Sequence, residues 1–300
     1  MVSGAASLIA SGVVVRDRPL GPLTTYKAGG PARYFADVDS TTSLEELIAS
    51  GLAREVPTLV LGRGSNLVVA DEGFDGLVIR LGGEFQDVTF DGVVVTSGSA
   101  EPLPRLARKS VEAGVLGLEF FVGVPGSVGG AVRQNAGCFG LEVKDRLVDA
   151  MIVDLCDGTR RTIDPEGLEL GYRQSNLRAT DLVLKARFRG ESGDPEQGKR
   201  VMRDITRWRR DNQPGGTLNA GSVFKNPDDI SAGELIDSLG LKGTSVGDVS
   251  VSERHANFFV AGPSATSADI RALVEVVKDT VRERTGTILE PEIQFIGFVE

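Results

Sequence analysis

The sequence predicts an α+β fold in which short strands and short helices alternate without a regular strand–helix–strand repeat. Over the first two thirds of the chain, the hydrophobic pattern switches between strand and helix periodicity. A polar stretch rich in Gly and Pro, GESGDP at 190–195, marks a linker. A long charged helix follows it, with further helices and strands that are typical of a separate α/β domain. We therefore predict one region at 1–190, divided near 98–100, and a C-terminal domain at 195–300.

The strands of the first region are expected in short runs rich in β-branched residues. They lie at 33–38, 57–61, 67–70, 77–81, 88–90, 93–97, 148–154, 161–163 and 182–189. Two helices are expected among them. Ser43 would cap the first, LEELIAS, and Gly114 would end the second, which spans 103–113.

The C-terminal domain is expected to begin with a helix at about 196–211, with Val201, Ile205 and Trp208 on one apolar stripe. A second helix is expected at 232–239 and a strand at 257–261. A third helix would run over 267–284, opened by Ser267 and closed by Gly286. The last predicted element is a strand at 288–299.

Composition excludes several classes of function. The formal net charge of −9 argues against nucleic-acid binding, which needs a basic surface. One histidine and two cysteines, Cys138 and Cys156, offer no metal site and no disulfide framework. No apolar run is long enough to span a membrane, and the N-terminus lacks a basic leader. We expect a cytoplasmic, monomeric protein.

The densest glycine-rich segment of the chain is GLEFFVGVPGSVGGA at 117–131. Glycine allows backbone to approach a ligand closely. Ser127 would cap a short helix that begins near Val128 and leave free N–H groups that attract phosphate. The alternative is a tightly packed turn against a helix.

A second glycine loop, GRGSN at 62–66, lies between two predicted strands. It lacks the third glycine and the following helix of a dinucleotide fingerprint, so we interpret it as a nest of backbone N–H groups. Ser65 and Asn66 would add side-chain donors. Such turns are common in hairpins, but two of them together suit the diphosphate of a long cofactor.

Two segments offer acids. Ser222 follows Ala-Gly in NAGSVFKNP at 219–227, where proton donation is more plausible than acyl chemistry because GxSxG is absent and no histidine is near. The alternative is a hydroxyl that caps a turn. Glu290 and Glu292 would share a face of the last strand, where an apolar setting raises the pKa of a carboxyl; the alternative is an exposed pair.

Basic and aromatic candidates are less specific. Tyr172 and Arg173 place a ring beside a guanidinium that can stabilise an anionic heterocycle or a carboxylate, or they form an exposed turn. His255 could contact a ligand or be a structural hydrogen-bonded histidine. The arginines of the long helix form a solvated face, or its last ones meet an anion.

The motifs together, nearly end to end and in this order, resemble the UDP-N-acetylenolpyruvoylglucosamine reductase family. The resemblance is carried by LGRGSN at 61–66, GLEFFVGVPGSVGGA at 117–131, QNAGCFG at 134–140, GYRQS at 171–175, NAGSVFKNP at 219–227, AGELID at 232–237, LKG at 241–243, RHANFFV at 254–260 and LEPEIQFIG at 289–297.

This resemblance implies an FAD-binding fold of the PCMH/vanillyl-alcohol-oxidase type, built of two subdomains, with a C-terminal domain that binds a UDP-sugar. It implies non-covalent FAD, NADPH as co-substrate and a reaction in peptidoglycan precursor synthesis. Ser222 would protonate C2 of the enolpyruvyl group, Glu292 would assist at the substrate carboxylate, and Arg173 would lie against the flavin.

The resemblance also implies binding residues. FAD contacts are expected at Gly62, Arg63, Gly64, Ser65, Asn66, Gly123, Val124, Pro125, Gly126, Ser127, Gly129, Gly130, Asn135, Ala136 and Gly137. Contacts with the UDP-sugar are expected at Tyr172, Arg210, Lys225, Asn226, Lys242 and His255.

Two departures accompany the resemblance. No counterpart of a tyrosine-bearing loop follows Tyr172, which indicates a shorter subtype, and Arg254 stands where many members carry Lys. Two other functions remain open at this point. One is an alcohol-oxidising flavoenzyme with covalently linked FAD, and the other is a module without enzymatic activity that binds a UDP-sugar or a nucleotide.

Overall fold

The structure, a computed structural model, describes residues 3–299 of the chain. These residues form two compact units whose segments interleave along the sequence. Unit 1 consists of residues 3–17, 33–63 and 75–208, and unit 2 of residues 18–32, 64–74 and 209–299. The C-terminal unit therefore also contains two segments from the first 75 residues. The assignment of FAD binding to residues 1–190 and of UDP-sugar binding to residues 195–300 stays a prediction.

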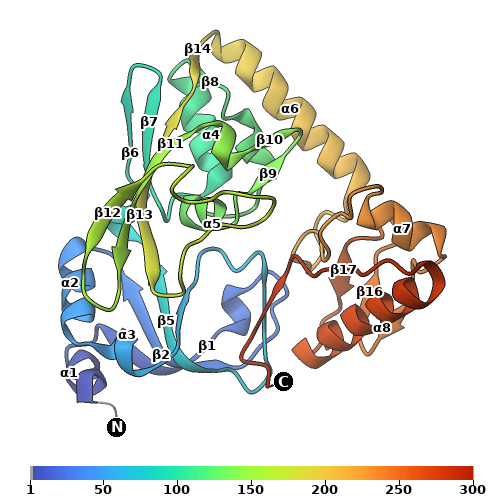
Figure 1. The fold of residues 1–300 in the computed structure, drawn as a ribbon, viewed down its shortest axis with the longest axis horizontal. Helices are drawn as coiled ribbons and strands as arrows, with labels where there is room; N and C mark the ends of the chain where they lie inside the picture. Colours follow the sequence, from blue (N-terminus) through green and yellow to red (C-terminus); the bar gives the residue numbers. More distant parts are fainter. Residues whose placement is uncertain (1–2, 300) are drawn as a thin grey trace. The chain divides into compact units, whose positions relative to one another are not determined.

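Unit 1 holds the two larger sheets, with strand orders β1-β2-β5-β3 and β12-β11-β13-β7-β6 (Figure 1). The strands of these sheets are β1 (Val14–Pro19), β2 (Pro31–Val38), β3 (Thr58–Val60), β5 (Phe74–Leu81), β6 (Val88–Asp91), β7 (Val94–Gly98), β11 (Leu147–Asp154), β12 (Arg160–Ile163) and β13 (Asp181–Arg189). β3 and β5 run parallel, and the neighbours in the five-stranded sheet run antiparallel. The strands predicted from β-branched runs are confirmed to within a few residues.

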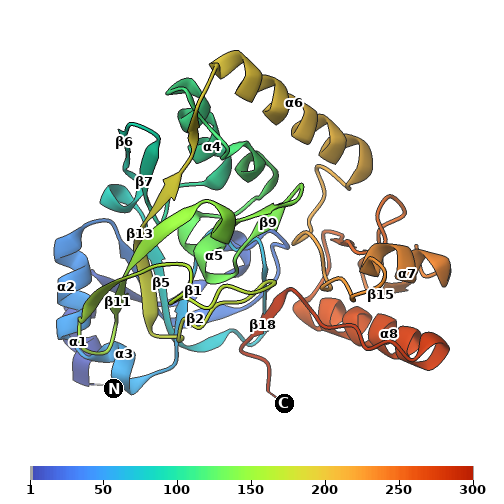
Figure 2. The same ribbon diagram turned by 45° about the horizontal axis from the view of Figure 1, so that its top comes forward.

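Shorter elements surround these sheets. Short paired strands are β8 (Val115–Leu116) with β14 (Glu191–Ser192), and β9 (Gly137–Cys138) with β10 (Leu141–Glu142). The helices are α1 (Ser3–Ala10), α2 (Thr41–Ala49), α3 (Leu52–Glu55), α4 (Leu103–Glu112), α5 (Val128–Arg133) and α6 (Pro195–Asn212). The 3₁₀ turns are Gly83–Gln86, Glu119–Gly123 and Val143–Asp145. α5 packs against β13, as Figure 2 shows.

Two details of these helices differ from the prediction. Ser40, not Ser43, caps α2; Ser43 is the third helical residue and returns a hydrogen bond to Ser40, which completes a capping box. The apolar stripe of α6 was also wrong, because Val201 and Trp208 are 42% and 46% exposed. The buried face runs through Gly198, Met202 and Ile205. A methyl group on Gly198 would lie 2.7 Å from Val111, so α6 and α4 approach closely.

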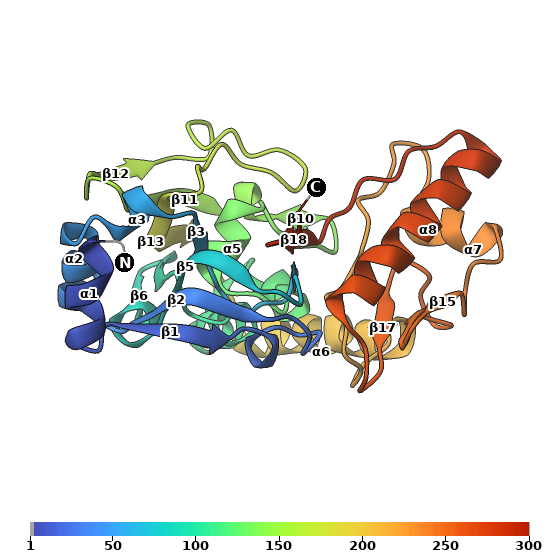
Figure 3. The same ribbon diagram turned by 90° about the horizontal axis from the view of Figure 1, so that it is seen from below.

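Unit 2 is a three-stranded sheet, β15-β16-β17, with α8 beside it (Figure 3). Its elements are a 3₁₀ turn at Gly21–Leu23, β4 (Leu67–Val69), α7 (Ala232–Ser238), β15 (Ser245–Val246), β16 (Val249–Val251), β17 (Phe259–Ala261), α8 (Ser267–Thr285) and β18 (Gln294–Ile296). The predicted cap of α8 was wrong by one residue: Thr266 caps it, and Ser267 is its first helical residue. Gly286 ends it in the left-handed conformation, as predicted.

The last predicted strand, 288–299, is reduced to β18, which pairs in parallel with β4. The reason is that the two parts of the predicted strand pair with different segments, because Pro291 forms a bridge with Phe224 and not with β4. The backbone before β18 pairs instead with residues 223–225. β4 and β18 are more than 220 residues apart in the sequence, yet Leu67 pairs with Gln294.

The cores follow the two units. Unit 1 has two apolar cores, one around Phe121 and Phe188 and one around Tyr34 and Leu44. The core of unit 2 includes Tyr26 together with side chains of α8. Among residues 3–299, no helix is both long and apolar enough to cross a membrane.

Candidate functional site

The two glycine-rich loops predicted to bind FAD meet at Ser127 in unit 1. A methyl group on Gly62 would lie 2.6 Å from Ser127 Oγ, and one on Gly130 would lie 3.7 Å from the same atom. Ser127 is 5% exposed, whereas Gly62 and Gly130 are exposed. Accessible backbone without side chains therefore lies on either side of a hydroxyl, which fits a phosphate-bearing group such as the diphosphate of FAD.

The expected helix start is only partly available to a ligand. Ser127 stands at the N-cap position of α5 but makes no side-chain capping bond. The N–H of Val128 donates to Glu101 O at 3.0 Å, and the N–H of Gly129 donates to Ser99 O at 2.8 Å. The prediction of free N–H groups at this helix was therefore wrong for these two amides. The loop is tightly packed here, which was the alternative interpretation.

The second half of the 62–66 loop belongs to unit 2. Gly64 has φ of +61°, and a methyl group there would lie 2.3 Å from Leu23 O, so only glycine fits. The side chain of Asn66 donates to Glu292 O at 2.9 Å. Asn66 thus holds the segment of a predicted catalytic residue. The FAD contacts expected at Arg63, Ser65 and Asn66 stay predictions.

A polar network joins the segment of Asn135 to that of Arg173. Asn135 is fully buried, and its Nδ2 donates to Glu142 Oε2 and to Gly171 O, both at 2.9 Å. Its Oδ1 accepts from the N–H of Lys144 at 2.9 Å. The carboxamide therefore ties the predicted FAD segment 135–137 to the turn that carries Arg173.

Arg173 has φ of +57°, a conformation that side chains other than glycine rarely adopt. Its Nη2 donates to Gly137 O at 3.3 Å, and its Nη1 lies 3.5 Å from Glu142 Oε1. The guanidinium carbon is 4.9 Å from the ring centre of Tyr172. The Arg173 side chain is 18% exposed, whereas Tyr172 is 44% exposed. The structure thus directs Arg173 toward the predicted FAD segment.

Ser222 lies in unit 2 on a short extended segment, between the segment of Asn257 and the segment of Glu292. On one side, the N–H of Val223 donates to Asn257 O at 2.9 Å; on the other, Val223 O accepts from the N–H of Glu292 at 2.7 Å. Ser222 and Glu292 are thus joined through one residue's backbone. Within residues 3–299 the Ser222 hydroxyl has no hydrogen-bond partner, so its proton is available to a ligand.

The two glutamates of the LEPEIQ motif have different surroundings. Glu290 is exposed and forms an ion pair with Lys225, whose Nζ is 3.2 Å from Glu290 Oε2. Glu292 is half-buried, and its backbone is fixed by Val223 and Asn66. The two glutamates flank Pro291, which forms a bridge with Phe224 ahead of β18, and their position on one face stays a prediction.

Comparisons with known proteins agree with these motifs. Residues 213–296 match the family model "UDP-N-acetylenolpyruvoylglucosamine reductase, C-terminal domain", and residues 32–164 match "FAD binding domain". The UDP-N-acetylenolpyruvoylglucosamine reductase of Synechococcus sp. (strain RCC307) is 42% identical, over 94% of this chain and 93% of the relative. The chain belongs to the UDP-N-acetylenolpyruvoylglucosamine reductase family. It is an FAD-dependent oxidoreductase of peptidoglycan synthesis, as the resemblance implied.

Further relatives support the same family. The enzyme of Agathobacter rectalis is 39% identical, over 95% of this chain and 94% of the relative. The crystal structure of the reductase from Thermus caldophilus matches with a TM-score of 0.80 at 39% identity, covering 94% of this chain and 98% of that one. The expected α+β fold, with an FAD-binding part and the family's C-terminal domain, is confirmed.

The predicted substrate residues of this reductase lie mainly around α7 in unit 2. Asn226 Oδ1 accepts from the N–H of Ala232 at 3.1 Å, and Lys242 Nζ lies 2.6 Å from Asp237 Oδ2. His255 accepts the N–H of Asn257 on Nδ1 at 3.2 Å. Burial lowers the pKa of His255, and the charge of Lys242 lowers it further, so the ring is neutral at pH 7.

Arg210 is exposed and pairs with Asp211, at 3.0 Å. Arg254 donates to Arg210 O at 3.0 Å. It therefore binds a carbonyl at the C-terminal end of α6, where a cation is favourable.

Sequence reasoning missed several residues that fix the predicted site segments within each unit. Asn257, 2% exposed, bonds through its side chain to both N–H and C=O of Phe224. Tyr26 OH donates to Phe259 O at 3.3 Å. Glu142 contacts Asn135 and Arg173. Asn257 stands in the RHANFFV motif, which could have drawn attention to it, whereas Tyr26 and Glu142 carry no motif signal.

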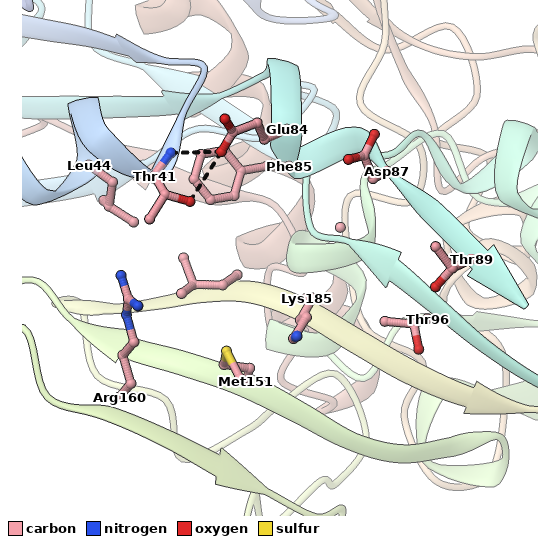
Figure 4. A pocket seen from close by; sticks show the side chains of 12 residues that line it. Thr41, Leu44, Glu84, Phe85, Asp87, Thr89, Thr96, Met151, Arg160 and Lys185 are labelled. Carbon is pink, nitrogen blue, oxygen red and sulfur yellow. Dashed lines mark hydrogen bonds between the residues drawn. The ribbon is translucent and has the colours of Figure 1, made fainter. Parts of the chain in front are cut away.

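A cavity of about 340 Å³ lies elsewhere in unit 1 (Figure 4). Leu44, Phe85 and Met151 line its apolar part, and Glu84 accepts hydrogen bonds from the N–H and hydroxyl of Thr41 at its edge. None of the predicted FAD, catalytic or UDP-sugar residues lines it, so it is separate from the reductase site.

Proposed function

We propose that this chain reduces UDP-N-acetylglucosamine enolpyruvate to UDP-N-acetylmuramate, with NADPH as the reductant and non-covalent FAD as the carrier. When bound, FAD would accept a hydride from NADPH and pass it to C3 of the enolpyruvyl group. The backbone around Ser127 would hold its diphosphate, with Asn135 and Gly137 nearby. We further propose that the protein is a cytoplasmic monomer.

Ser222 is the proposed proton donor to C2 of the substrate. The observation that carries this role is a hydroxyl without a hydrogen-bond partner among residues 3–299, on a segment fixed from both sides by Asn257 and by Glu292. A fixed segment favours proton transfer because the donor need not be ordered again when the substrate binds. A serine hydroxyl is a weak acid, so the donation requires close placement against C2.

Glu292 is proposed to act at the substrate carboxylate. Its backbone N–H bonds to Val223 O, next to Ser222 in the sequence, and Asn66 holds its carbonyl. These bonds couple the positions of the two predicted catalytic side chains. Arg173, in unit 1, is proposed to stabilise negative charge on the flavin with its guanidinium. Lys242, His255 and Asn226 are proposed to contact the UDP-sugar.

The decisive experiment separates the two halves of the reaction in Ser222→Ala. NADPH should bleach the FAD of the variant anaerobically at the wild-type rate, but adding the enolpyruvyl UDP-sugar should restore the yellow absorbance at least about 100-fold more slowly. Ser222→Cys, which keeps a proton on the side chain, should recover part of the rate. Ser245→Ala, an exposed hydroxyl of unit 2, is the control and should behave as wild type.

Three results would contradict the proposal. Wild-type reoxidation by Ser222→Ala would remove Ser222 as proton donor. Purified protein that stays colourless after reconstitution with FAD would remove the flavin chemistry. Yellow colour that stays with the acid-precipitated protein would favour covalently bound FAD.

A further inference from the structure

The carboxylate of Glu142 is the meeting point of the polar groups around Arg173. Its Oε1 lies 3.5 Å from Arg173 Nη1, and its Oε2 accepts from Asn135 Nδ2 at 2.9 Å. Lys144 Nζ is 3.0 Å from Oε2. The Glu142 side chain is 22% exposed, and that of Arg173 is 18% exposed. Charges this sheltered interact more strongly than those of fully exposed pairs.

The carboxylate of Glu142 also helps to fix the strained turn that carries Arg173. A non-glycine residue at φ of +57° persists only where its surroundings fix it. Here Asn135 binds Gly171 O on one side of the turn, and Glu142 binds both Asn135 and the Arg173 guanidinium. Without Glu142, the guanidinium would lose its carboxylate and Asn135 would lose one acceptor.

We propose that Glu142 is a positioning residue that holds the Arg173 guanidinium against the FAD segment and offsets part of its charge there. This inference rests on the proposed function, because that proposal places Arg173 against the flavin. A guanidinium favours the reduced, anionic form of FAD, and a carboxylate paired with it weakens this preference. Glu142 therefore sets how strongly Arg173 favours reduced over oxidised FAD.

The test is the midpoint potential of bound FAD in the whole protein, measured by anaerobic titration against a reference dye. Glu142→Gln keeps the size of the side chain and an acceptor oxygen but removes the charge. It should tighten the binding of reduced relative to oxidised FAD about tenfold, which for a two-electron couple is a shift of about +30 mV. The dissociation constant of oxidised FAD, measured by fluorescence, reports separately on the integrity of the binding loops.

Asp145→Asn is the matched control. Asp145 lies in the same loop and accepts the N–H of Glu142, a bond that asparagine can also accept, but no contact joins it to Arg173 in the described residues. The control should shift the potential far less than Glu142→Gln. An equal shift in the control, or no shift or a negative one in Glu142→Gln, would overturn the proposal.

Lys144→Gln tests the proposal even if Glu142→Gln does not bind FAD. Lys144→Gln removes one of the two cations that pair with Glu142 among the described residues, so the potential should move in the negative direction; an unchanged or more positive potential would contradict the inference. Where Glu142→Gln does bind FAD, the same change in an Arg173→Gln background should shift the potential much less, and an undiminished shift would show that Glu142 does not act through Arg173.

Failure of the proposed function gives a different pattern. In that case the wild type itself would lack FAD or would fail to be reoxidised by the enolpyruvyl UDP-sugar, whatever the variants do. A wild type that turns over normally while the potentials ignore residue 142 would overturn only the role of Glu142.

Discussion

The side chain of Asn257 forms two hydrogen bonds with the backbone of Phe224, accepting its N–H at 2.9 Å and donating to its C=O at 2.8 Å. Asn257 is almost fully buried, and its own carbonyl accepts the N–H of Val223. The amide therefore takes the place of a neighbouring strand for the segment that begins at Ser222. No carboxylate can do this, because it cannot donate to a carbonyl.

We expect Asn257→Asp to lower kcat by about 10- to 100-fold, since a small displacement of a reacting group has a large effect on rate. The loss should fall on reoxidation by the substrate, whereas NADPH should reduce the FAD normally. Asn176→Asp, the same change at an exposed amide of unit 1, is the control. Stopped-flow absorbance measures both half-reactions, and equal slowing of both would refute a specific effect on Ser222.

Asp71 binds the first turn of α8, although it precedes Ser267 by 196 residues in the sequence. Its Oδ1 accepts the N–H of Ser267, and its Oδ2 accepts the N–H of Ala268, each at 3.0 Å. Asp71→Ala should reduce the free energy of unfolding by about 1–2 kcal/mol, because two helix N–H groups and the helix dipole lose a carboxylate.

Urea denaturation measures the effect of Asp71→Ala. Asp75→Ala is its matched control, because Asp75 forms an exposed ion pair with Arg33 and its loss should cost less than about 1 kcal/mol. Equal losses in the two variants would contradict the capping role of Asp71.

Stability should fall on the acid side through His255. Burial, followed by the charge of Lys242, lowers the pKa of His255 in the folded protein. The unfolded chain then binds a proton more readily, so the contribution of neutral His255 is present above the unfolded pKa of about 6.5 and is lost as the pH falls through the folded value.

His255→Asn can keep an acceptor for the N–H of Asn257 but does not titrate in this range. Urea midpoints between pH 7 and pH 5 should therefore fall more steeply in the wild type than in this variant. Parallel curves for the two proteins would show that protonation of His255 is not coupled to folding.

At alkaline pH, the free energy of unfolding should depend on the ionisation of Tyr26. Burial raises the pKa of Tyr26 well above its usual range, although a backbone group of Ala220 acts in the opposite direction. The stabilisation is full below the unfolded pKa of about 10 and is lost at higher pH, because the unfolded chain releases this proton first.

Tyr26→Phe removes the hydrogen bond to Phe259 O and should reduce the free energy of unfolding at pH 7 by about 0.5–1.5 kcal/mol. Above pH 10 the gap between wild type and variant should narrow, as followed by guanidinium denaturation. A gap that stays constant between pH 7 and pH 11 would argue against coupling of this ionisation to folding.

Much of the fold could be predicted from the sequence because its signals are local. Runs of β-branched residues located the strands, and Gly114 and Gly286 correctly marked the ends of their helices. The predicted apolar stripe of α6 was wrong because packing against α4 decides which face of the helix is buried. Gly198 permits close approach to Val111, so Met202 is buried and Trp208 is not.

The candidate site was predictable as motifs but not as contacts. The motifs identified Ser222, Glu292 and Arg173 as candidate site residues. The hydrogen bond from Asn66 to Glu292, however, joins residues that are 226 positions apart in the sequence. No periodicity encodes such a pairing. Glu142 and Asp71 were missed for the same reason, because the residues that they contact, Arg173 and Ser267, lie far from them in the sequence.

The interleaving of unit 2 has a consequence for its biosynthesis. Residues 18–32 and 64–74 leave the ribosome well before β18, the partner of β4, has been made. These two early segments must therefore wait, with Val68 and Tyr26 not yet in their core, until the segment that forms β18 has been translated. Because pairing across such a sequence separation is slow, completion of unit 2 should be the late step of folding, and removal of the three-residue β18 should damage unit 2 more than the length of this strand suggests.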